Sequence, residues 1–353
     1  MKKILIVVPN LNNPAGTERA AINLANMLVT NYSVTILSLT HKTNDPFFDI
    51  SQKVNIIYEY ISNNNLSVLN KAKWFYSCYS VVNKIIKKNN INVAIGLTHN
   101  VNSVISLLKN RGLIAIGCEH IDYKTIPPIS KRIISKVYSR LDALVILSKE
   151  AWYDVNHLNN NIVIIPNPLS FETDKQHISD NKRIIMVGRL SREKGYERVI
   201  PLSKYLAINF PEWQISIFGE GYLKSELKAI IEKNNLSNTE LHGTTKDIMK
   251  EYLNSSIFIS TSHNEAFGMA ILEAMQVGLP VVSYRHHGSR ALISNNINGI
   301  IVENEHELIE QTSRLMMDIN LRKKIGAGGR NVSSSYTPNK IKDKWLQLLN
   351  SID

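Results

Sequence analysis

Two glutamates lie around a short turn in the second half of this sequence, and their setting is suited to holding a phosphate. Glu265 and Glu273 are eight residues apart, and the segment follows an apolar run at 257–260 that reads as a strand. Glu265 falls in the loop and Glu273 falls two turns inside a helix that ends near residue 277. The residues of the intervening turn are Phe267, Gly268, Met269 and Ala270. Free N–H groups at a helix N-terminus attract a phosphate, and Gly268 permits close approach, so the segment predicts a phosphate site.

Two cations lie at the end of another predicted strand, at 184–187. Gly188 forms the turn, and Arg189 and Lys194 follow in the loop. Two fixed cations at the carboxyl edge of a sheet can neutralise a diphosphate leaving group without a metal. The sequence contains no Asp-x-Asp pair for Mg²⁺ or Mn²⁺, so no metal site is predicted. The alternative interpretation is a pair of solvated loop cations.

The first half carries weaker signals at equivalent positions. Gly16 and Glu18 follow the predicted strand 4–8, and a glycine that opens a helix there suggests approach of a phosphate or a sugar. Only one glycine is present, so the dinucleotide fingerprint of a dehydrogenase is not met. His120 follows the predicted strand 113–117, where a functional role competes with a structural one.

Further glycines mark other strand ends. One turn contains Gly219 and Gly221, and Gly288 follows the pair His286–His287. The paired histidines do not predict a metal site, because adjacent side chains point apart and no third ligand is near.

Short apolar runs alternate with helical stretches along the whole chain, which is typical of parallel sheets with crossover helices. The strands predicted in the first half are 4–8, 34–39, 54–57, 93–97, 113–117, 143–147 and 162–165, and the helices include 17–29, 66–89, 99–109 and 129–140. The strands predicted in the second half are 184–187, 214–218, 239–242, 257–260, 280–283 and 299–302.

The proline-rich stretch 165–168 separates the two series. We therefore expect an α/β protein of two doubly wound domains, 1–166 and 167–337, with a binding cleft between them. A last amphipathic helix at 338–351 needs an apolar surface, and we expect 338–353 to pack back on the first domain.

Composition limits the class of protein. The net charge is +11, and 18 Lys+Arg against 9 Asp+Glu lie in residues 1–166, so the first half should meet the anionic partner. The basic start followed by the apolar run 4–8 resembles a signal peptide, but the run is too short, and a first strand fits better. The two cysteines have no metal-ligand spacing and predict buried reduced thiols. A nucleic-acid-binding interpretation rests on charge alone, without interleaved aromatics or a known module.

Together these segments resemble the family 4 retaining glycosyltransferases, in nearly the whole chain and in the family's order. The resemblance implies the GT-B fold, in which two Rossmann-like domains face a central cleft. It implies that Glu265 contacts the donor sugar, that Glu273 contacts the ribose, and that the backbone from Gly268 to Ala270 meets the diphosphate. Arg189 and Lys194 match the family's basic pair on that diphosphate.

The resemblance also covers the first domain. Gly16 and Glu18 match a Gly-Gly-x-Glu loop near donor and acceptor, with Ala15 in place of the first glycine. His120 matches a histidine that contacts the 6-hydroxyl region of the donor sugar. The residues predicted to be catalytic are His120, Arg189, Lys194 and Glu265. Those predicted to bind the donor are Gly16, Glu18, Gly188, Gly221, Phe267, Gly268, Met269, Ala270 and Glu273.

The implied activity is a retaining, metal-independent hexosyltransferase without a cofactor. It would move a hexose or N-acetylhexosamine from a nucleotide diphosphate sugar, with UDP favoured, to a growing surface glycan. Segment 118–140 is similar to bacterial transferases that extend polyprenyl-diphosphate-linked sugars. The alternatives are a nucleotide-sugar epimerase, or a synthase or phosphorylase of the same fold acting on a soluble acceptor.

The predicted location is cytoplasmic, with peripheral attachment to the inner face of the cell membrane. On the basic helix, Ile129, Ile133 and Val137 form one row, beside a row of Arg132, Lys136 and Arg140. Such a helix can lie on an anionic membrane surface, or it can be an ordinary surface helix. A second basic-aromatic cluster, near Lys71, Lys73, Trp74 and Phe75, suggests the same.

Overall fold

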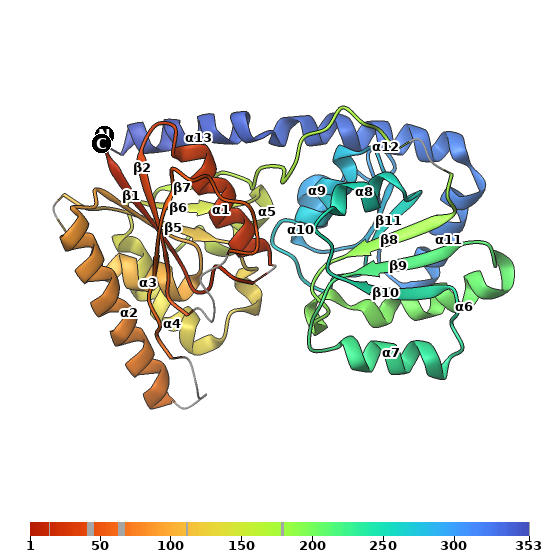
Figure 1. Cartoon of the computed structure of the whole chain (residues 1–353), viewed down its shortest axis with the longest axis horizontal. Coiled ribbons are helices and arrows are strands. Elements are labelled where there is room, and N and C mark those ends of the chain that lie inside the picture. Colours follow the sequence, from red (N-terminus) through yellow and green to blue (C-terminus); the bar gives the residue numbers. More distant parts are fainter. Residues whose placement is uncertain (14, 41–45, 63–67, 111, 178–179, 353) are drawn as a thin grey trace. The chain divides into compact units, whose positions relative to one another are not determined.

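A computed structural model of the chain describes residues 1–13, 15–40, 46–62, 68–110, 112–177 and 180–352. These residues form two compact units, one comprising Met1–Pro168 with Pro338–Asp353 and the other Leu169–Thr337 (Figure 1). The first boundary lies two residues beyond the predicted one at 166/167. Pro14 and residues 66–67, the first two of a predicted helix, lie outside the described residues.

The first unit contains a parallel sheet in the order β3-β2-β1-β4-β5-β6-β7. Its strands are β1 (Lys3–Val8), β2 (Ser33–Ser38), β3 (Asn55–Tyr58), β4 (Val93–Gly96), β5 (Ile114–Glu119), β6 (Ala143–Ile146) and β7 (Ile162–Ile164). Its helices are α1 (Gly16–Leu28), α2 (Val68–Asn89), α3 (His99–Leu108), α4 (Pro128–Val137), α5 (Lys149–Val155) and α13 (Pro338–Ser351), with 3-10 turns η1 (Tyr123–Thr125) and η2 (Tyr138–Arg140). In register, Ile6 of β1 lies opposite Ile36 of β2 and Ile95 of β4.

Both faces of this sheet are buried, which explains why its strands are nearly continuous apolar runs. On one face the core includes residues of α1 and α13, among them Leu24 and Trp345. On the other face α2, α3, α4 and α5 contribute, for example through Val82, Ile105 and Ile134. Figure 1 shows α13, in blue, beside α1, in red, and the two helices are in contact.

The second unit repeats the design, with a parallel sheet in the order β10-β9-β8-β11-β12-β13. Its strands are β8 (Arg183–Val187), β9 (Gln214–Phe218), β10 (Thr239–Gly243), β11 (Ile257–Ser260), β12 (Val281–Tyr284) and β13 (Ile300–Val302). Its helices are α6 (Ile200–Asn209), α7 (Lys224–Lys233), α8 (Ile248–Leu253), α9 (Met269–Gln276), α10 (His287–Leu292), α11 (Glu305–Met317) and α12 (Ile319–Ser333), and its 3-10 turns are η3 (Arg192–Lys194), η4 (Tyr196–Val199) and η5 (Ser334–Tyr336).

In each unit the first strand lies in the middle of its sheet. The chain runs outward from β1 to β3 and then returns to the other side at β4, and β8 to β10 and then β11 repeat the pattern. The loops after β8 and β11 therefore separate at the carboxyl edge, where ligands bind in open α/β sheets. The expected fold class is confirmed.

Most predicted elements match within one or two residues, and the differences have local causes. The predicted helix 129–140 ends at Val137, where φ widens to −113° within the right-handed region, and the chain continues as the 3-10 turn η2. The predicted strand 280–283 begins one residue later, because Pro280 has no N–H for the ladder. Among the described residues, no helix is long and apolar enough to cross a membrane.

Helix α13 supplies a test of the packing, because Trp345 is 5% exposed in the core it shares with α1. Replacing Trp345 with alanine should lower the free energy of unfolding of the first unit by about 3 kcal/mol, through lost burial and the cavity left behind. Urea unfolding followed by circular dichroism measures this free energy in the variant and in wild type. Lys344→Ala, at the exposed neighbouring position, is the control and should change little; equal effects of the two variants would contradict this packing.

Candidate functional site: the carboxyl edge of the second sheet

An ion pair links the loops after β8 and β11. Lys194, in η3, places its Nζ 2.6 Å from Oε2 of Glu265, and the two side chains are 19% and 21% exposed. The hydroxyl of Ser262 donates to the same carboxylate oxygen at 3.2 Å. The structure therefore brings together one cation and one acid that the sequence analysis placed in the site.

The charge state of Glu265 follows from these contacts. Burial raises the pKa of its carboxyl, but the Lys194 ammonium and the hydrogen bonds from Lys194 and Ser262 outweigh burial and hold the pKa below its ordinary value. Glu265 is thus a carboxylate near neutral pH, able only to accept hydrogen bonds. A group of this kind suits the hydroxyls of a sugar.

The backbone holds Lys194 in place. Gly195 ends η3 in the left-handed region at φ +58°, and a Cβ there would lie 2.5 Å from the carbonyl oxygen of Thr261. Thr261 returns a hydrogen bond from its hydroxyl to the Lys194 carbonyl at 2.9 Å. The η3 turn therefore packs directly on the loop after β11, and only glycine fits at position 195.

The turn before α9 has the form expected of a phosphate site. Gly268 precedes the helix at φ +92°, in the left-handed region where glycine is favoured. Phe267 and Gly268 are buried, and the Phe267 ring packs on Tyr336 with centroids 5.7 Å apart, while Met269 and Ala270 are half-buried. The first N–H groups of α9 have no acceptor within the helix itself, which leaves them suited to an anion.

The remaining predicted residues of this unit have other environments. Arg189 pairs with Glu193 at 2.6 Å, with 57% of its side chain exposed, and does not share the acid that Lys194 contacts. Glu273 is 2% exposed and accepts a hydrogen bond from the Tyr252 hydroxyl at 3.1 Å.

The glycines at neighbouring strand ends have packing reasons. A Cβ at Gly221 would lie 2.2 Å from the carbonyl oxygen of Leu190, so Gly221 lets the loop after β9 pack on the loop after β8. The carbonyl of Gly188 accepts a hydrogen bond from the Tyr196 hydroxyl at 2.9 Å.

Three predicted residues lie in the first unit, at the carboxyl edge of its own sheet. Gly16 begins α1, and a Cβ at this position would meet nothing within 4 Å, so packing does not require glycine there. Glu18, in the first turn of α1, is 7% exposed and accepts a hydrogen bond from the Asn13 amide at 3.5 Å.

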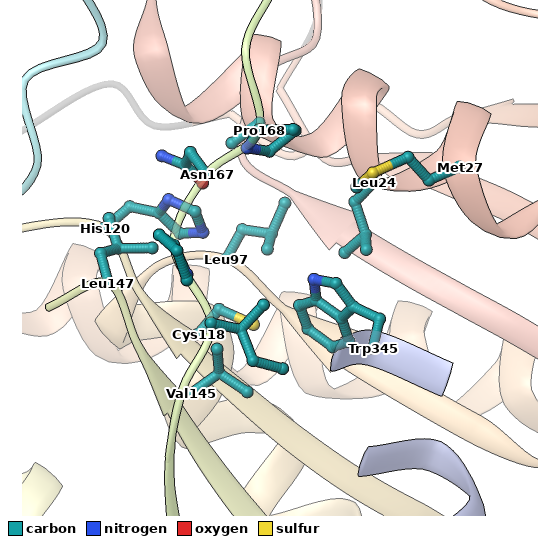
Figure 2. Close-up of a pocket in the computed structure, with 13 residues that line it drawn as sticks. Leu24, Met27, Leu97, Cys118, His120, Val145, Leu147, Asn167, Pro168 and Trp345 are labelled. Atoms are coloured by element: carbon teal, nitrogen blue, oxygen red, sulfur yellow. The ribbon is translucent and has the colours of Figure 1, made fainter. Parts of the chain in front are cut away.

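His120 follows β5 and borders a small pocket of the first unit. Figure 2 shows its ring and that of Trp345 on opposite sides of this pocket, with Asn167 near the histidine. About 10 Å³ is open to the centre of a water molecule, which is room for one water and not for a sugar. Burial lowers the pKa of His120 to about 4, so the ring is neutral, and its buried Nδ1 has no hydrogen-bond partner among the described residues.

The residue before His120 forms a buried polar cluster on the opposite face of the sheet. Glu119 accepts hydrogen bonds from Tyr138 and, at 2.8 Å, from Asn102, and burial raises the pKa of its carboxyl to about 7. The Asn102 side chain lies where a Cβ at Gly96 or Gly117 would collide with it. This cluster fixes the end of β5 against α3 and η2.

Sequence reasoning missed His286, the residue after Arg285 at the end of β12. Its backbone N–H and its ring cap α10, and it lies beside Glu265. The only signal in the sequence is a histidine at a strand end, two residues before a glycine, and the paired histidines resemble a metal site more than a helix cap.

The ion pair gives a prediction about stability. Lys194→Met should lower the free energy of unfolding at pH 7 by about 2 kcal/mol, because it leaves the Glu265 carboxylate poorly solvated and without its cation. Adding Glu265→Gln to that variant should recover much of the loss. Urea unfolding of the single and double variants measures both effects, and a double variant no more stable than the single one would count against the pair.

The same pair has a definite pH dependence. Because the pKa of Glu265 is depressed in the folded protein, its stabilisation is present above the ordinary value of 4.5 and is lost as the pH falls below that value. The difference in melting temperature between wild type and Lys194→Met should therefore be largest near pH 7 and should shrink as the pH falls from about 4.5 towards 3. A difference that stays constant over this range would contradict the assignment.

Comparisons with known proteins find relatives of the chain. Residues 170–332 match the model of the family described as glycosyl transferases group 1. The chain is 25% identical to the amylovoran biosynthesis glycosyltransferase AmsD of Erwinia amylovora, over 99% of this chain and all of that protein. It is 22% identical to an α-1,4-N-acetyl-D-galactosaminyltransferase of Campylobacter jejuni, named for a diNAcBac-PP-undecaprenol-linked substrate, over 99% of this chain and 98% of that one.

A solved structure shares the fold. The Staphylococcus aureus TarM G117R mutant, in complex with fondaparinux, α-GlcNAc-glycerol and UDP, superimposes with a TM-score of 0.84 at 16% identity, over 99% of this chain and all of that one. The expected GT-B fold is thus confirmed.

Proposed function

We propose that this chain, whose residues 170–332 match the family model of the group 1 glycosyl transferases, is a retaining hexosyltransferase that uses a nucleotide diphosphate sugar. The observation that carries the proposal is the contact of Lys194 with Glu265 beside the left-handed Gly268 that opens α9. A cation, an anion-binding helix end and a carboxylate then meet at one sheet edge. A sugar attached to a diphosphate needs all three.

The diphosphate would be the leaving group, and negative charge grows on it as the glycosidic bond breaks. Lys194 and the first N–H groups of α9 would stabilise that charge more in the transition state than in the ground state, which is what accelerates a reaction. The Arg189 pair with Glu193 is largely exposed, and such pairs are weak, so Arg189 can turn to the phosphates at little cost. These positive groups would replace a metal ion.

Glu265 would hold the transferred sugar. Its ionised carboxylate accepts hydrogen bonds from two sugar hydroxyls and keeps the ring fixed while the acceptor attacks from the face of the departing phosphate. The leaving phosphate takes the proton of the acceptor, which accounts for retention without a covalent intermediate. We assign Glu273 to the ribose, as the family resemblance implies; for this contact the carboxylate must exchange the Tyr252 hydroxyl for a ribose hydroxyl.

The first unit would bind the acceptor. Gly16 and Glu18, assigned from the sequence to the donor, and His120, assigned to the donor sugar in catalysis, are all at the carboxyl edge of the same sheet, around β1 and β5. The neutral His120 ring can donate a hydrogen bond to a sugar hydroxyl or accept one from it. The open space at Gly16 agrees with a glycine kept for a ligand and not for packing.

The relatives support a choice of substrates. TarM was solved with UDP and α-GlcNAc-glycerol, and the Campylobacter relative is named for an undecaprenol-diphosphate-linked glycan. We infer a UDP-hexose or UDP-N-acetylhexosamine as donor and a growing surface glycan, linked to polyprenyl diphosphate, as acceptor.

Kinetics of single variants test the site. Lys194→Ala should lower kcat/KM for the UDP-sugar about a hundredfold or more, because one charged transition-state contact is lost. Glu265→Gln should lower it at least tenfold, because the amide presents a donor in place of an acceptor. The control is Glu197→Gln, which disturbs only the exposed contact with His263.

The products of the same assay distinguish the alternatives. An α-linked product from an α-linked donor, formed equally with EDTA, is expected. An inverted product would overturn the retaining mechanism. A reaction that EDTA stops would overturn the metal-independence, and epimerisation of the donor without an acceptor would overturn the assignment as a transferase. Wild-type rates in Lys194→Ala and Glu265→Gln would overturn the site.

A lipid-linked acceptor requires the enzyme to work at a membrane surface, and α4 has the side chains for it. Ile129 and Ile133 are 71% and 44% exposed, and Arg132 and Lys136 of α4 and Arg140 of η2 are exposed as well. Apolar side chains beside cations are attracted to anionic lipid. The second predicted cluster is less suitable, since Trp74 and Phe75 are partly buried against the core of the unit.

Charge reversal tests the membrane surface. The test changes Arg132, Lys136 and Arg140 together to glutamate. Binding to vesicles of phosphatidylglycerol and phosphatidylcholine should weaken by about a hundredfold, because each lost cation removes roughly 1 kcal/mol of binding free energy. Transfer to a soluble acceptor analogue should be unchanged. Reversal of three exposed lysines of the second unit, Lys204, Lys233 and Lys246, is the control; equal loss in both triple variants would refute α4 as the attachment surface.

A further inference from the structure

Tyr336 packs its ring on the turn that opens α9. It is the last residue of η5 and lies two residues before Pro338, the first residue beyond the second unit. Its ring and that of Phe267 have centroids 5.7 Å apart and an interplanar angle of 57°, an arrangement in which aromatic rings attract each other. Phe267 is 3% exposed, and the next residue is the left-handed Gly268. The Tyr336 ring therefore contacts the residue that leads directly into the phosphate site.

The backbone of Tyr336 is held by the other end of the same unit. The N–H of Leu169, the first residue of the second unit, donates to the Tyr336 carbonyl at 2.8 Å. Leu169 is 2% exposed, and a hydrogen bond in a poorly solvated place is stronger than one in water. Helix α12 also contacts η5. The two ends of the unit thus meet here and fix the place of the Tyr336 ring.

The residues just after this hydrogen bond contact the rest of α9. The ring centroids of Phe171 and Tyr252 are 6.4 Å apart, and the Tyr252 hydroxyl donates to the Ala270 carbonyl at 3.4 Å. At the last residue of α9, the Gln276 amide donates to the Thr173 carbonyl at 3.3 Å. The chain that enters the second unit therefore supports α9 along its length, and the Tyr336 ring supports the turn at the phosphate end.

On the backbone side, the same turn is supported by α10. The N–H of Gly288 donates to the Glu265 carbonyl at 2.8 Å. A Cβ at Gly288 would lie 2.5 Å from both the carbonyl carbon and oxygen of Phe267, and 2.9 Å from the nitrogen of Gly268. The start of α10 thus contacts the peptide between Phe267 and Gly268, whereas Tyr336 contacts the Phe267 side chain.

We propose that Tyr336 is a positioning residue of the donor site: its ring holds Phe267, and through Phe267 the first N–H groups of α9, in the place that binds the diphosphate. The inference rests on the proposed function and adds a residue that contacts neither donor nor acceptor. Hydrogen-bond donors that are aligned in advance stabilise a charge without reorganising, so a looser turn binds the diphosphate less tightly. A nucleoside without phosphates does not use these donors, and its binding does not depend on Tyr336.

Calorimetric titration of UDP and of uridine into two variants tests this role. Tyr336→Leu keeps an apolar side chain and the backbone bond to Leu169 but removes the ring. It should weaken the binding of UDP about fivefold, while uridine binds as it does to wild type. Tyr336→Phe keeps the ring and should bind UDP within about twofold of wild type.

The matched control is Tyr205→Leu. Tyr205 is also a half-buried tyrosine of the second unit, and its ring pairs with that of Phe210 at a centroid distance of 6.2 Å. The pair lies at the end of α6, which leads into β9 at the amino edge of the sheet, away from the proposed donor site. Tyr205→Leu should therefore leave the binding of UDP unchanged.

Hydrogen exchange measures the turn without any ligand. The Leu272 N–H donates to the Gly268 carbonyl at 3.1 Å, in the first turn of α9. The exchange of this amide, followed by NMR, should be about fivefold faster in Tyr336→Leu than in wild type, because the turn opens more easily without the ring contact. It should be unchanged in Tyr205→Leu.

Wild-type affinity for UDP in Tyr336→Leu, or equal losses in Tyr336→Leu and Tyr205→Leu, would overturn the positioning role. An equal loss in Tyr336→Phe would also overturn it, because the ring would then not be the group that acts. If wild type bound UDP no more tightly than uridine, the proposed function would fail, and the exchange rate of the Leu272 amide would still decide whether Tyr336 holds the turn.

Discussion

The contact between Lys194 and Glu265 joins the parts of the second unit on which the proposed chemistry depends. It links the loops after β8 and β11, which separate at the middle of the parallel sheet. The η3 turn reaches this point because Gly195 lets it pack on the Thr261 backbone. The carboxylate is retained in a poorly solvated place only because a cation faces it, so the position of each group depends on the other.

Around that pair the chain uses backbone more than side chains. Gly268 adopts the left-handed conformation that begins α9, and Gly288 lets α10 touch the same turn. A hydrogen bond from the backbone N–H of Gly288 to the Glu265 carbonyl then holds the loop of Glu265. Under the proposed function, a site built in this way would need no rearrangement to stabilise a diphosphate.

Much of the fold could be predicted from the sequence, because buried parallel strands are continuous apolar runs and the helices between them are periodic. The paired Lys194 and Glu265 were also within reach, since each follows a predicted strand. The partners of other residues could not be predicted. The hydrogen bond of Tyr252 to Glu273 and the ion pair of Glu193 with Arg189 depend on side-chain geometry. His286 was missed because a helix cap made by a histidine ring leaves no spacing pattern in the sequence.

Calorimetric titration of UDP, UMP and uridine into wild type and Lys194→Met tests the central claim most directly, since the claim is that this sheet edge binds a nucleotide diphosphate. The account predicts that UDP binds wild type at least tenfold more tightly than UMP, that uridine binds weakest, and that Lys194→Met removes most of the advantage of UDP over UMP. Equal binding of UDP and uridine to wild type, or the same preference for UDP in Lys194→Met, would contradict it.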